Sequence, residues 1–295
     1  MENILKRFIL PILLAVVLLA ACGPAAAPTP VPIAVASTTV PSTAVPPTAI
    51  PPTATPTPRT LTVFAAASLT DAFKEIGSTF EAAHPGVTIT LNFAGSQTLS
   101  TQLIQGASAD VFASANHTEM DKVVAASLVA QGTPQDFLTN ILTVILPAAN
   151  PANVQTLQDL AKPGLKLDLE DKSVPAGGYT LTILDNLSKD PTYGADFKTK
   201  VLANVVSYET DVKQVVAKVQ LGEADAGIVY ISDAIAAPTL KTITIPSNDN
   251  VVAKYPIAAL SNASQPDLAA EFISYVLSSD GQAILKKWGF TPIAP

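Results

Sequence analysis

The sequence predicts an α/β fold with largely parallel sheets. Short apolar segments rich in Val, Ile and Phe alternate with segments whose apolar residues recur at helical spacing, which is the pattern of strands joined by crossover helices. From about Thr60 to Pro295 the chain is also long enough for one large domain, or for two lobes that each have a core.

The expected strands are short apolar segments. They are residues 61–65, 87–93, 111–115, 142–146, 166–169 and 227–230. Residues 139–146 and 251–258 have the composition of extended hinge strands, and we expect the chain to cross between two lobes there.

The expected helices are amphipathic, so each should pack one face on a sheet. Apolar residues at helical spacing predict helices over residues 69–80 and 212–219. Two more helices are expected at residues 268–277 and 281–288, with Trp288 in the core.

The N-terminus has the features of a secretory signal. Lys6 and Arg7 precede an apolar run that ends at Ala21 and is too short to span a bilayer comfortably. The residues up to Cys22, the only cysteine, resemble the lipobox of bacterial lipoproteins. We therefore expect residues 1–21 to be a lipoprotein signal peptide and Cys22 to carry the lipid, which would anchor the chain to the extracytoplasmic side of the cell membrane.

Residues 22–59 are rich in Pro, Thr and Ala and lack apolar periodicity, so we expect a disordered linker between the anchor and the folded part. The formal net charge of the chain is −7, which makes nucleic acid an unsuitable partner. With a single cysteine, no disulfide can form within the chain.

Four junctions between an expected strand and the following helix consist mainly of small or hydroxyl residues. They lie in the segments AAASLTD, FAGSQTL, VPAGGY and YETDV. Ser68 could be only a helix cap with Asp71 three residues later, and Thr210 or Asp211 is the expected cap of the fourth helix. Pro175 suits a first helical turn.

Such junctions lie at the carboxyl ends of strands, where ligands bind in open α/β sheets. The first turn of a helix carries unpaired backbone N–H groups and a partial positive charge. Together, the four junctions predict an anion site that needs no formal countercharge.

Six segments, in order, resemble one family: the extracytoplasmic molybdate-binding proteins that feed ABC importers. They are TVFAAASLTDAF, FAGSQTL, ADVFASA, VPAGGY, ADAGIVYISDA and KKWGFTPI. The resemblance covers nearly all of residues 60–295. It implies a two-lobed periplasmic-binding-protein-like fold of type II, with a mixed sheet flanked by helices in each lobe and two hinge strands between them. Lobe 1 would comprise residues 60–141 and 252–295, and lobe 2 residues 142–251.

The resemblance also implies the ligand-binding residues. The family holds its oxyanion with two serines that match Ser68 and Ser96, with backbone N–H groups that match Ala176 and Val212, and with a tyrosine hydroxyl that matches Tyr230. Gly95 and Gln97 stand where the family often has serine. A related branch adds carboxylates to the metal, but Ala176 and Val212 occupy those positions here, so we expect a tetrahedral oxyanion that no protein group coordinates through the metal.

The expected ligand is molybdate, with tungstate as a close equivalent, and the expected partner is the membrane permease of an ABC importer. A wall of donors alone would leave the hydroxyl of a protonated phosphate unpaired, at a cost of roughly 1 to 3 kcal/mol. Sulfate, a smaller tetrahedral dianion, stays open as the alternative ligand. We expect a monomer without a cofactor.

Two other classes of function are weaker alternatives. A hydrolase would use Ser68 or Ser96 as nucleophile and His84 or His117 as base, but no nucleophile-elbow motif is present and the serine contexts resemble helix caps. Two separated histidines and one cysteine do not make a metal site. An adhesion module would explain the anchor and linker, but not four junctions stripped to donors. We therefore expect a binding protein and not an enzyme.

Overall fold

The computed structural model describes residues 58–293. The expected signal peptide at residues 1–21, the lipid-attachment site Cys22 and almost all of the linker at 22–59 lie outside the described residues.

The first sheet has six strands in the order β11-β4-β10-β3-β1-β2. Their bounds are β1 Arg59–Ala66, β2 Val87–Ala94, β3 Val111–Ala113, β4 Gln135–Asn140, β10 Ala253–Ala259 and β11 Thr291–Pro292. Strand β1 is parallel to β2 and β3, whereas β10 is antiparallel to β3 and β4.

The second sheet has five strands in the order β7-β6-β8-β5-β9. Their bounds are β5 Leu142–Leu146, β6 Leu167–Glu170, β7 Val205–Glu209, β8 Ala226–Tyr230 and β9 Lys241–Thr244. Strand β6 is parallel to β7 and β8, whereas β5 is antiparallel to β8 and β9. The prediction of largely parallel sheets is therefore wrong, and the mixed sheets implied by the family resemblance are confirmed.

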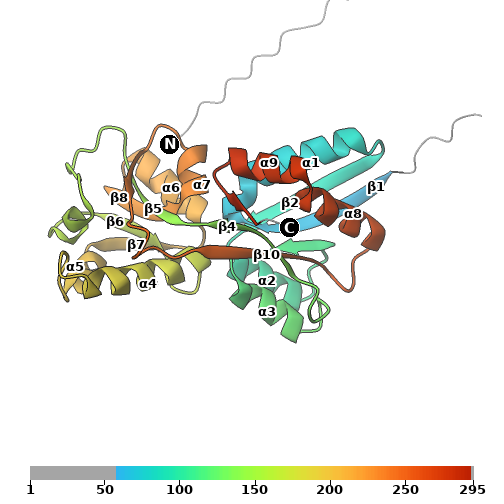
Figure 1. Ribbon diagram of the computed structural model, residues 1–295, viewed down its shortest axis with the longest axis horizontal. Helices are drawn as coiled ribbons and strands as arrows, with labels where there is room; N and C mark the ends of the chain where they lie inside the picture. The colour runs from blue at the N-terminus through green and yellow to red at the C-terminus, as the bar shows by residue number, and fades with distance from the viewer. Residues whose placement is uncertain (1–57, 294–295) are drawn as a thin grey trace, which may run out of the picture. The chain divides into compact units, whose positions relative to one another are not determined.

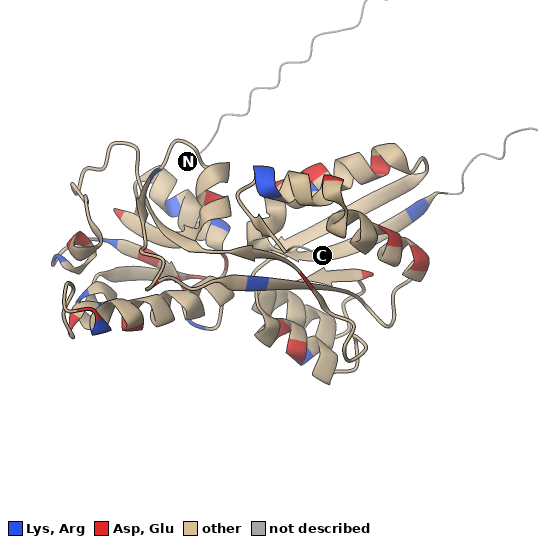
Figure 2. Ribbon diagram, in the orientation of Figure 1, with Lys and Arg blue, Asp and Glu red and all other residues tan. Residues whose placement is uncertain are grey.

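Helices cover both faces of each sheet. Figure 1 shows α1, α8 and α9 on one face of the first sheet and α2 and α3 on the other, and it shows α6 and α7 opposite α4 and α5 on the second sheet. Their bounds are α1 Thr70–Ala83, α2 Ser96–Ile104, α3 His117–Ala125, α4 Pro175–Lys189, α5 Phe197–Ala203, α6 Val212–Leu221, α7 Ile231–Ala236, α8 Pro266–Leu277 and α9 Ser279–Lys287. Acidic and basic residues are interspersed along these helices (Figure 2).

The chain passes from the first sheet to the second between β4 and β5, with Ile141 as the single residue between them. It returns through the segment that precedes β10. Asn250 joins the two crossings, because its Nδ2 donates to the carbonyl oxygen of Leu142 at 2.8 Å and its Oδ1 accepts from the Leu142 N–H at 3.2 Å. This side chain therefore links the two chain segments that cross between the sheets.

All four predicted junctions lie at the carboxyl end of a strand. Pro175 opens α4 as predicted, and Asp211 caps α6, where its side chain accepts hydrogen bonds from the N–H groups of Lys213 and Gln214. Ser68 lies instead in the 3-10 turn Ala67–Leu69, and neither this turn nor α1 begins with a side-chain cap. The capping interpretation of Ser68 is therefore wrong, which leaves its hydroxyl free for another role.

Trp288 differs from the prediction of a core residue. It follows α9, is only partly buried against the core, and donates from Nε1 to Glu75 Oε2 at 2.8 Å. The core beneath α1 is built by other aromatic residues, with Phe73 and Phe80 each packed edge-on against Phe272 of α8.

Candidate functional site

A small cavity lies where the four predicted junctions meet. Its walls come from the ends of β1, β6 and β8, from the segments that follow β2 and β3, and from the starts of α2, α4 and α6. The residues that line it are Ala66, Ala67, Ser68, Gly95, Ser96, Ala115, Glu170, Val174, Pro175, Val212 and Tyr230. Four of the five predicted ligand residues thus lie at one cavity, which draws on both sheets.

Ser68 and Ser96 present buried hydroxyls to this cavity from the first sheet. The Ser96 Oγ accepts a hydrogen bond from the Ala115 N–H at 2.9 Å, so its own hydroxyl hydrogen can be donated to a ligand. The Ser68 Oγ lies 2.9 Å from the hydroxyl of Tyr255 in β10. Ser96 therefore keeps its hydrogen for a ligand, and Ser68 does so when the Tyr255 hydroxyl is the donor of their bond.

Tyr230 ends β8 and is buried, with 2% of its surface exposed. Among the described residues its hydroxyl has no hydrogen-bond partner, although buried polar groups are nearly always paired. Burial raises the pKa of Tyr230 well above its usual value, so the hydroxyl keeps its proton. The site thus contains a buried hydroxyl that keeps its proton and can donate a hydrogen bond.

The two predicted backbone donors differ in position. Val212 is the first residue of α6 and lines the cavity. Ala176 lies in the first turn of α4, is fully buried and does not line the cavity, whereas its neighbours Val174 and Pro175 do.

Glu170, the last residue of β6, lines the cavity and was not predicted. Its side chain is buried, and its Oε2 accepts a hydrogen bond from the Gly177 N–H of α4 at 3.1 Å. Burial, followed by the charge of Asp233, raises the pKa of Glu170 well above its usual value, against the opposing effect of the α4 N–H groups. The predicted wall of donors alone is therefore wrong, because the Glu170 carboxyl has an oxygen that can accept a hydrogen bond in either protonation state.

The backbones of the two sheets approach closely beside the cavity at Gly95 and Thr210. A Cβ added to Gly95 would overlap the carbonyl oxygen of Thr210, so only glycine fits there without a shift. The same carbonyl accepts a hydrogen bond from Gln97 Nε2 at 2.9 Å. Gly95 and Gln97, which depart from the serines common in the family, thus form a contact between the sheets.

Lys213 lies behind the cavity and joins acidic groups of different elements. Its Nζ is 2.8 Å from Asp71 Oδ2 of α1 and 3.1 Å from Asp233 Oδ1 of α7. Burial raises the pKa of Asp233 to about 6, although the charge of Lys213 opposes this rise. Burial lowers the pKa of Lys213, but Asp233 and Asp71 outweigh it and the pKa is raised.

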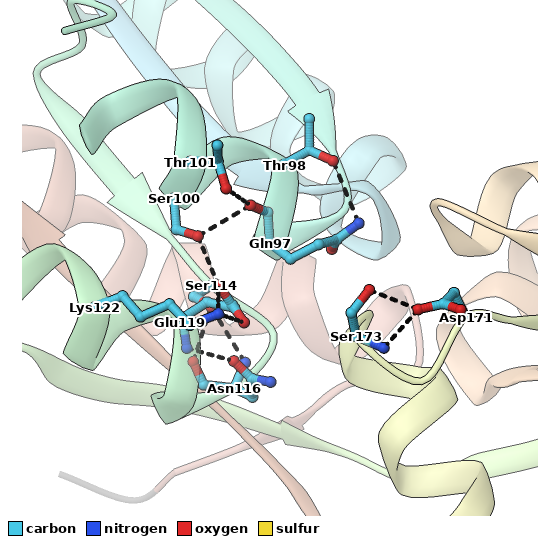
Figure 3. Close-up of polar contacts among 10 residues, drawn as sticks. All are labelled: Gln97, Thr98, Ser100, Thr101, Ser114, Asn116, Glu119, Lys122, Asp171 and Ser173. Carbon is cyan, nitrogen blue, oxygen red and sulfur yellow. Dashed lines mark hydrogen bonds and ion pairs between the residues drawn. The ribbon is translucent and has the colours of Figure 1, made fainter. Parts of the chain in front are cut away.

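Polar contacts hold the helices and loop around the site in place (Figure 3). Ser100 of α2 donates to Glu119 Oε2 of α3 at 2.6 Å, and Asn116 caps α3 by accepting from the Glu119 N–H. In the loop before α4, the Ser173 N–H and hydroxyl both bond to Asp171 Oδ1. These contacts join α2 to α3 and order the loop that leads into α4.

The serines do not contact the histidines that a hydrolase would need as a base. His84 stacks on Phe80 and bonds through Nδ1 to the Phe80 carbonyl oxygen at 2.8 Å. His117 is the first residue of α3, and its Nε2 lies 2.7 Å from Asp136 Oδ1. Within residues 58–293, no three His, Cys, Asp or Glu residues are grouped to hold a metal ion, and no helix is long and apolar enough to cross a bilayer.

Comparisons with known proteins all point to one family. The profile of the bacterial extracellular solute-binding proteins matches residues 61–291. The molybdate-binding protein ModA of Mycobacterium tuberculosis is 43% identical over 233 residues, which are 79% of this chain and 84% of the relative. ModA of Escherichia coli is 33% identical over 238 residues, covering 78% and 88% of the two chains.

Two solved structures share the fold. The substrate-binding domain of a putative molybdenum ABC transporter from Clostridium difficile is 30% identical, with a TM-score of 0.60 over 80% of this chain and 99% of that one. The sulfate-binding protein SubI of Mycobacterium tuberculosis is 20% identical, with a TM-score of 0.71 over 80% and 88%, which bears on the fold alone. The chain therefore belongs to the bacterial extracellular solute-binding proteins, in the family of the ModA proteins.

Proposed function

We propose that this protein captures molybdate, or the similar tungstate, between two lobes and delivers it to the membrane permease of an ABC importer. The observation that carries the proposal is the set of buried hydroxyls of Ser68, Ser96 and Tyr230 around one cavity beside the start of α6. Neither Lys nor Arg is among the described residues that line it. Neutral donors and helix N-termini suit an oxyanion that must later be released.

The proposed lobes follow the change of sheet along the chain. Lobe 1 is residues 60–141 and 252–295, and lobe 2 is residues 142–251. The chain crosses from the first sheet to the second at Ile141 and returns to the first sheet before β10, which supports these bounds. A ligand that bonds to both lobes would favour the closed arrangement, which the permease would then recognise.

The ligand residues in this proposal are Ser68, Ser96, Val212 and Tyr230, with Ala176 as a backbone donor from α4. The names of the relatives favour molybdate. Sulfate is the second candidate, since SubI has the same fold. The protein acts as a monomer that Cys22 anchors outside the cytoplasm, and it performs no catalysis.

A panel of oxyanions tests the ligand. Thermal unfolding of the chain from residue 22, with Cys22→Ser, is measured with molybdate, tungstate, sulfate and phosphate. A ligand at 100 times its Kd adds about 2.7 kcal/mol, or roughly 5 to 10 °C in Tm. Shifts with molybdate and tungstate support the proposal, whereas a shift with sulfate alone would replace molybdate by sulfate.

The site residues are tested with a matched pair of serines in α2. Ser96 lines the cavity, whereas Ser100, one turn on, is equally buried but bonds to Glu119. Ser96→Ala should weaken molybdate binding by roughly 1 to 3 kcal/mol, and Ser100→Ala should lower Tm without changing the Kd. Unchanged affinity in Ser96→Ala would refute the assignment.

A further inference from the structure

We propose that Glu170 takes up a proton when an oxyanion dianion binds, and that the neutral carboxyl then donates a hydrogen bond within the loaded site. This inference rests on the proposed function, since it concerns the same cavity. It makes Glu170 a residue that couples ligand affinity to pH.

The position of Glu170 carries the proposal. The residue ends β6 at the floor of the cavity, and only 5% of its surface is exposed. The Gly177 N–H fixes Oε2, and Gly177 has no room for a Cβ, because the added atom would overlap the carbonyl oxygen of Asp171. In this structure the carboxyl is therefore held at the cavity, beside the proposed ligand position.

The charges around Glu170 favour its neutral form. Lys213, a positive group behind the cavity, already pairs with Asp71 and Asp233. A bound dianion would add further negative charge within the same buried space, where charge repulsion is strong. The titratable groups that act on Glu170 are Asp233 of α7, Asp211 at the start of α6 and Tyr230 of β8. Lys213 and Asp71 lie beyond Asp233, Tyr179 lies beyond Tyr230, and Asp171 and Lys172 follow Glu170 in the chain.

The raised pKa of Glu170 in this structure agrees with that reasoning, because burial and Asp233 both disfavour the carboxylate. Tyr230 and Tyr179 keep their protons, since burial raises the pKa of both hydroxyls. They therefore cannot supply negative charge or titrate near neutral pH.

The proposal requires one proton to move from solvent to Glu170 for each oxyanion bound. In an open arrangement that precedes closure of the proposed lobes, Glu170 would meet water, where a glutamate is ionised at neutral pH. On binding, one proton from solvent joins the carboxylate, and the O–H bond so formed points a donor at an oxyanion oxygen. The affinity should therefore fall as the pH rises, by up to about tenfold per pH unit.

The experiment is calorimetry of molybdate binding at pH 6.5, 7.5 and 8.5, each in two buffers that differ in ionisation enthalpy. The wild-type protein should take up about one proton per molybdate and should bind more weakly at higher pH. Glu170→Gln keeps an N–H donor at this place and cannot titrate, so it should show neither effect. Glu209→Gln, at the end of the neighbouring strand β7 and outside the cavity lining, is the matched control and should behave as the wild type.

The outcomes separate the two proposals. Failure of the wild type to bind molybdate or tungstate at any pH would contradict the proposed function itself. Binding without proton uptake, or equal uptake by wild type and Glu170→Gln, would overturn only the role of Glu170. If Glu170→Gln does not fold, Glu170→Asp replaces it: a shorter carboxyl should retain proton uptake but shift the pH at which affinity falls, and an unchanged profile would count against the proposal.

Discussion

Lys213 of α6 lies 2.8 Å from Asp71 of α1, so an ion pair joins a helix on the second sheet to a helix on the first. Both side chains are about one-third exposed, at 30% and 34%. The pair stands beside the cavity and can form only when the two sheets approach. It should therefore stabilise the closed arrangement of the proposed lobes by a modest amount.

Asp71→Asn should weaken molybdate binding about twofold to fivefold, since partly exposed ion pairs contribute up to about 1 kcal/mol. The loss should shrink at high salt, because salt screens such pairs. The control is Glu75→Gln, which lies on the same helix but pairs with Lys287 of α9. Equal affinities for the two variants, measured by calorimetry at low salt, would show that the Lys213 pair does not assist closure.

Gly95→Ala should reduce affinity by at least tenfold, because the new Cβ would meet the Thr210 carbonyl oxygen and keep the sheets apart. Gly178→Ala is the matched control, since a Cβ there would make only ordinary contact, 3.5 Å from the Lys172 carbonyl oxygen. Both changes place alanine at a junction beside the site. If Gly95→Ala binds molybdate as well as Gly178→Ala does, the close approach has no part in binding.

Tyr230→Phe should separate binding from stability. The hydroxyl has no partner among the described residues, so its removal should leave the unfolding free energy of the ligand-free protein unchanged within about 0.5 kcal/mol. The affinity for molybdate should fall by roughly 1 to 3 kcal/mol, because the ligand loses a donor. Tyr193→Phe, which alters a tyrosine packed on Phe197, should leave the affinity intact. Unaltered binding in Tyr230→Phe would remove Tyr230 from the site.

Asp168→Asn should stabilise the protein, and more at pH 8 than at pH 5. Burial and then Glu209 raise the pKa of Asp168 to about 7, and neither carboxylate oxygen has a partner among the described residues. Because this folded pKa lies above the unfolded value of about 3.9, the wild type loses stability as the pH rises from about 4 to 7. The gain at pH 8 should be on the order of 1 to 3 kcal/mol.

Tm values at pH 5 and pH 8 test this prediction, with Asp185→Asn as the control because Asp185 is exposed and paired with Lys198. Parallel pH profiles for wild type and Asp168→Asn would mean that Asp168 does not titrate in this range.

Much of the fold could be predicted because local signals and packing agree. Strands β1, β2, β5 and β8 are apolar runs, and Pro175 and Asp211 mark helix starts by local chemistry. The antiparallel pairing was harder to predict than the strands themselves, since β10 reaches its place between β3 and β4 by long-range contacts that leave no mark in the nearby sequence.

The site was predictable only in part for the same reason. Ser68 resembles a helix cap in sequence, and its actual partner, Tyr255, lies 187 residues away. Glu170 looks like a solvent-exposed end of a strand, because only the folded chain brings α4 and Asp233 around it. A charged residue directly after an apolar strand and before a junction of small residues is the signal that could have identified it.

The position of the metal atom in crystals grown with molybdate or tungstate tests the proposed site most directly, since anomalous scattering locates that atom. We predict one peak in the cavity, with oxyanion oxygens within hydrogen-bonding distance of Ser68 Oγ, Ser96 Oγ and the Tyr230 hydroxyl. A peak elsewhere, or one bound by Lys or Arg side chains, would contradict capture by neutral donors.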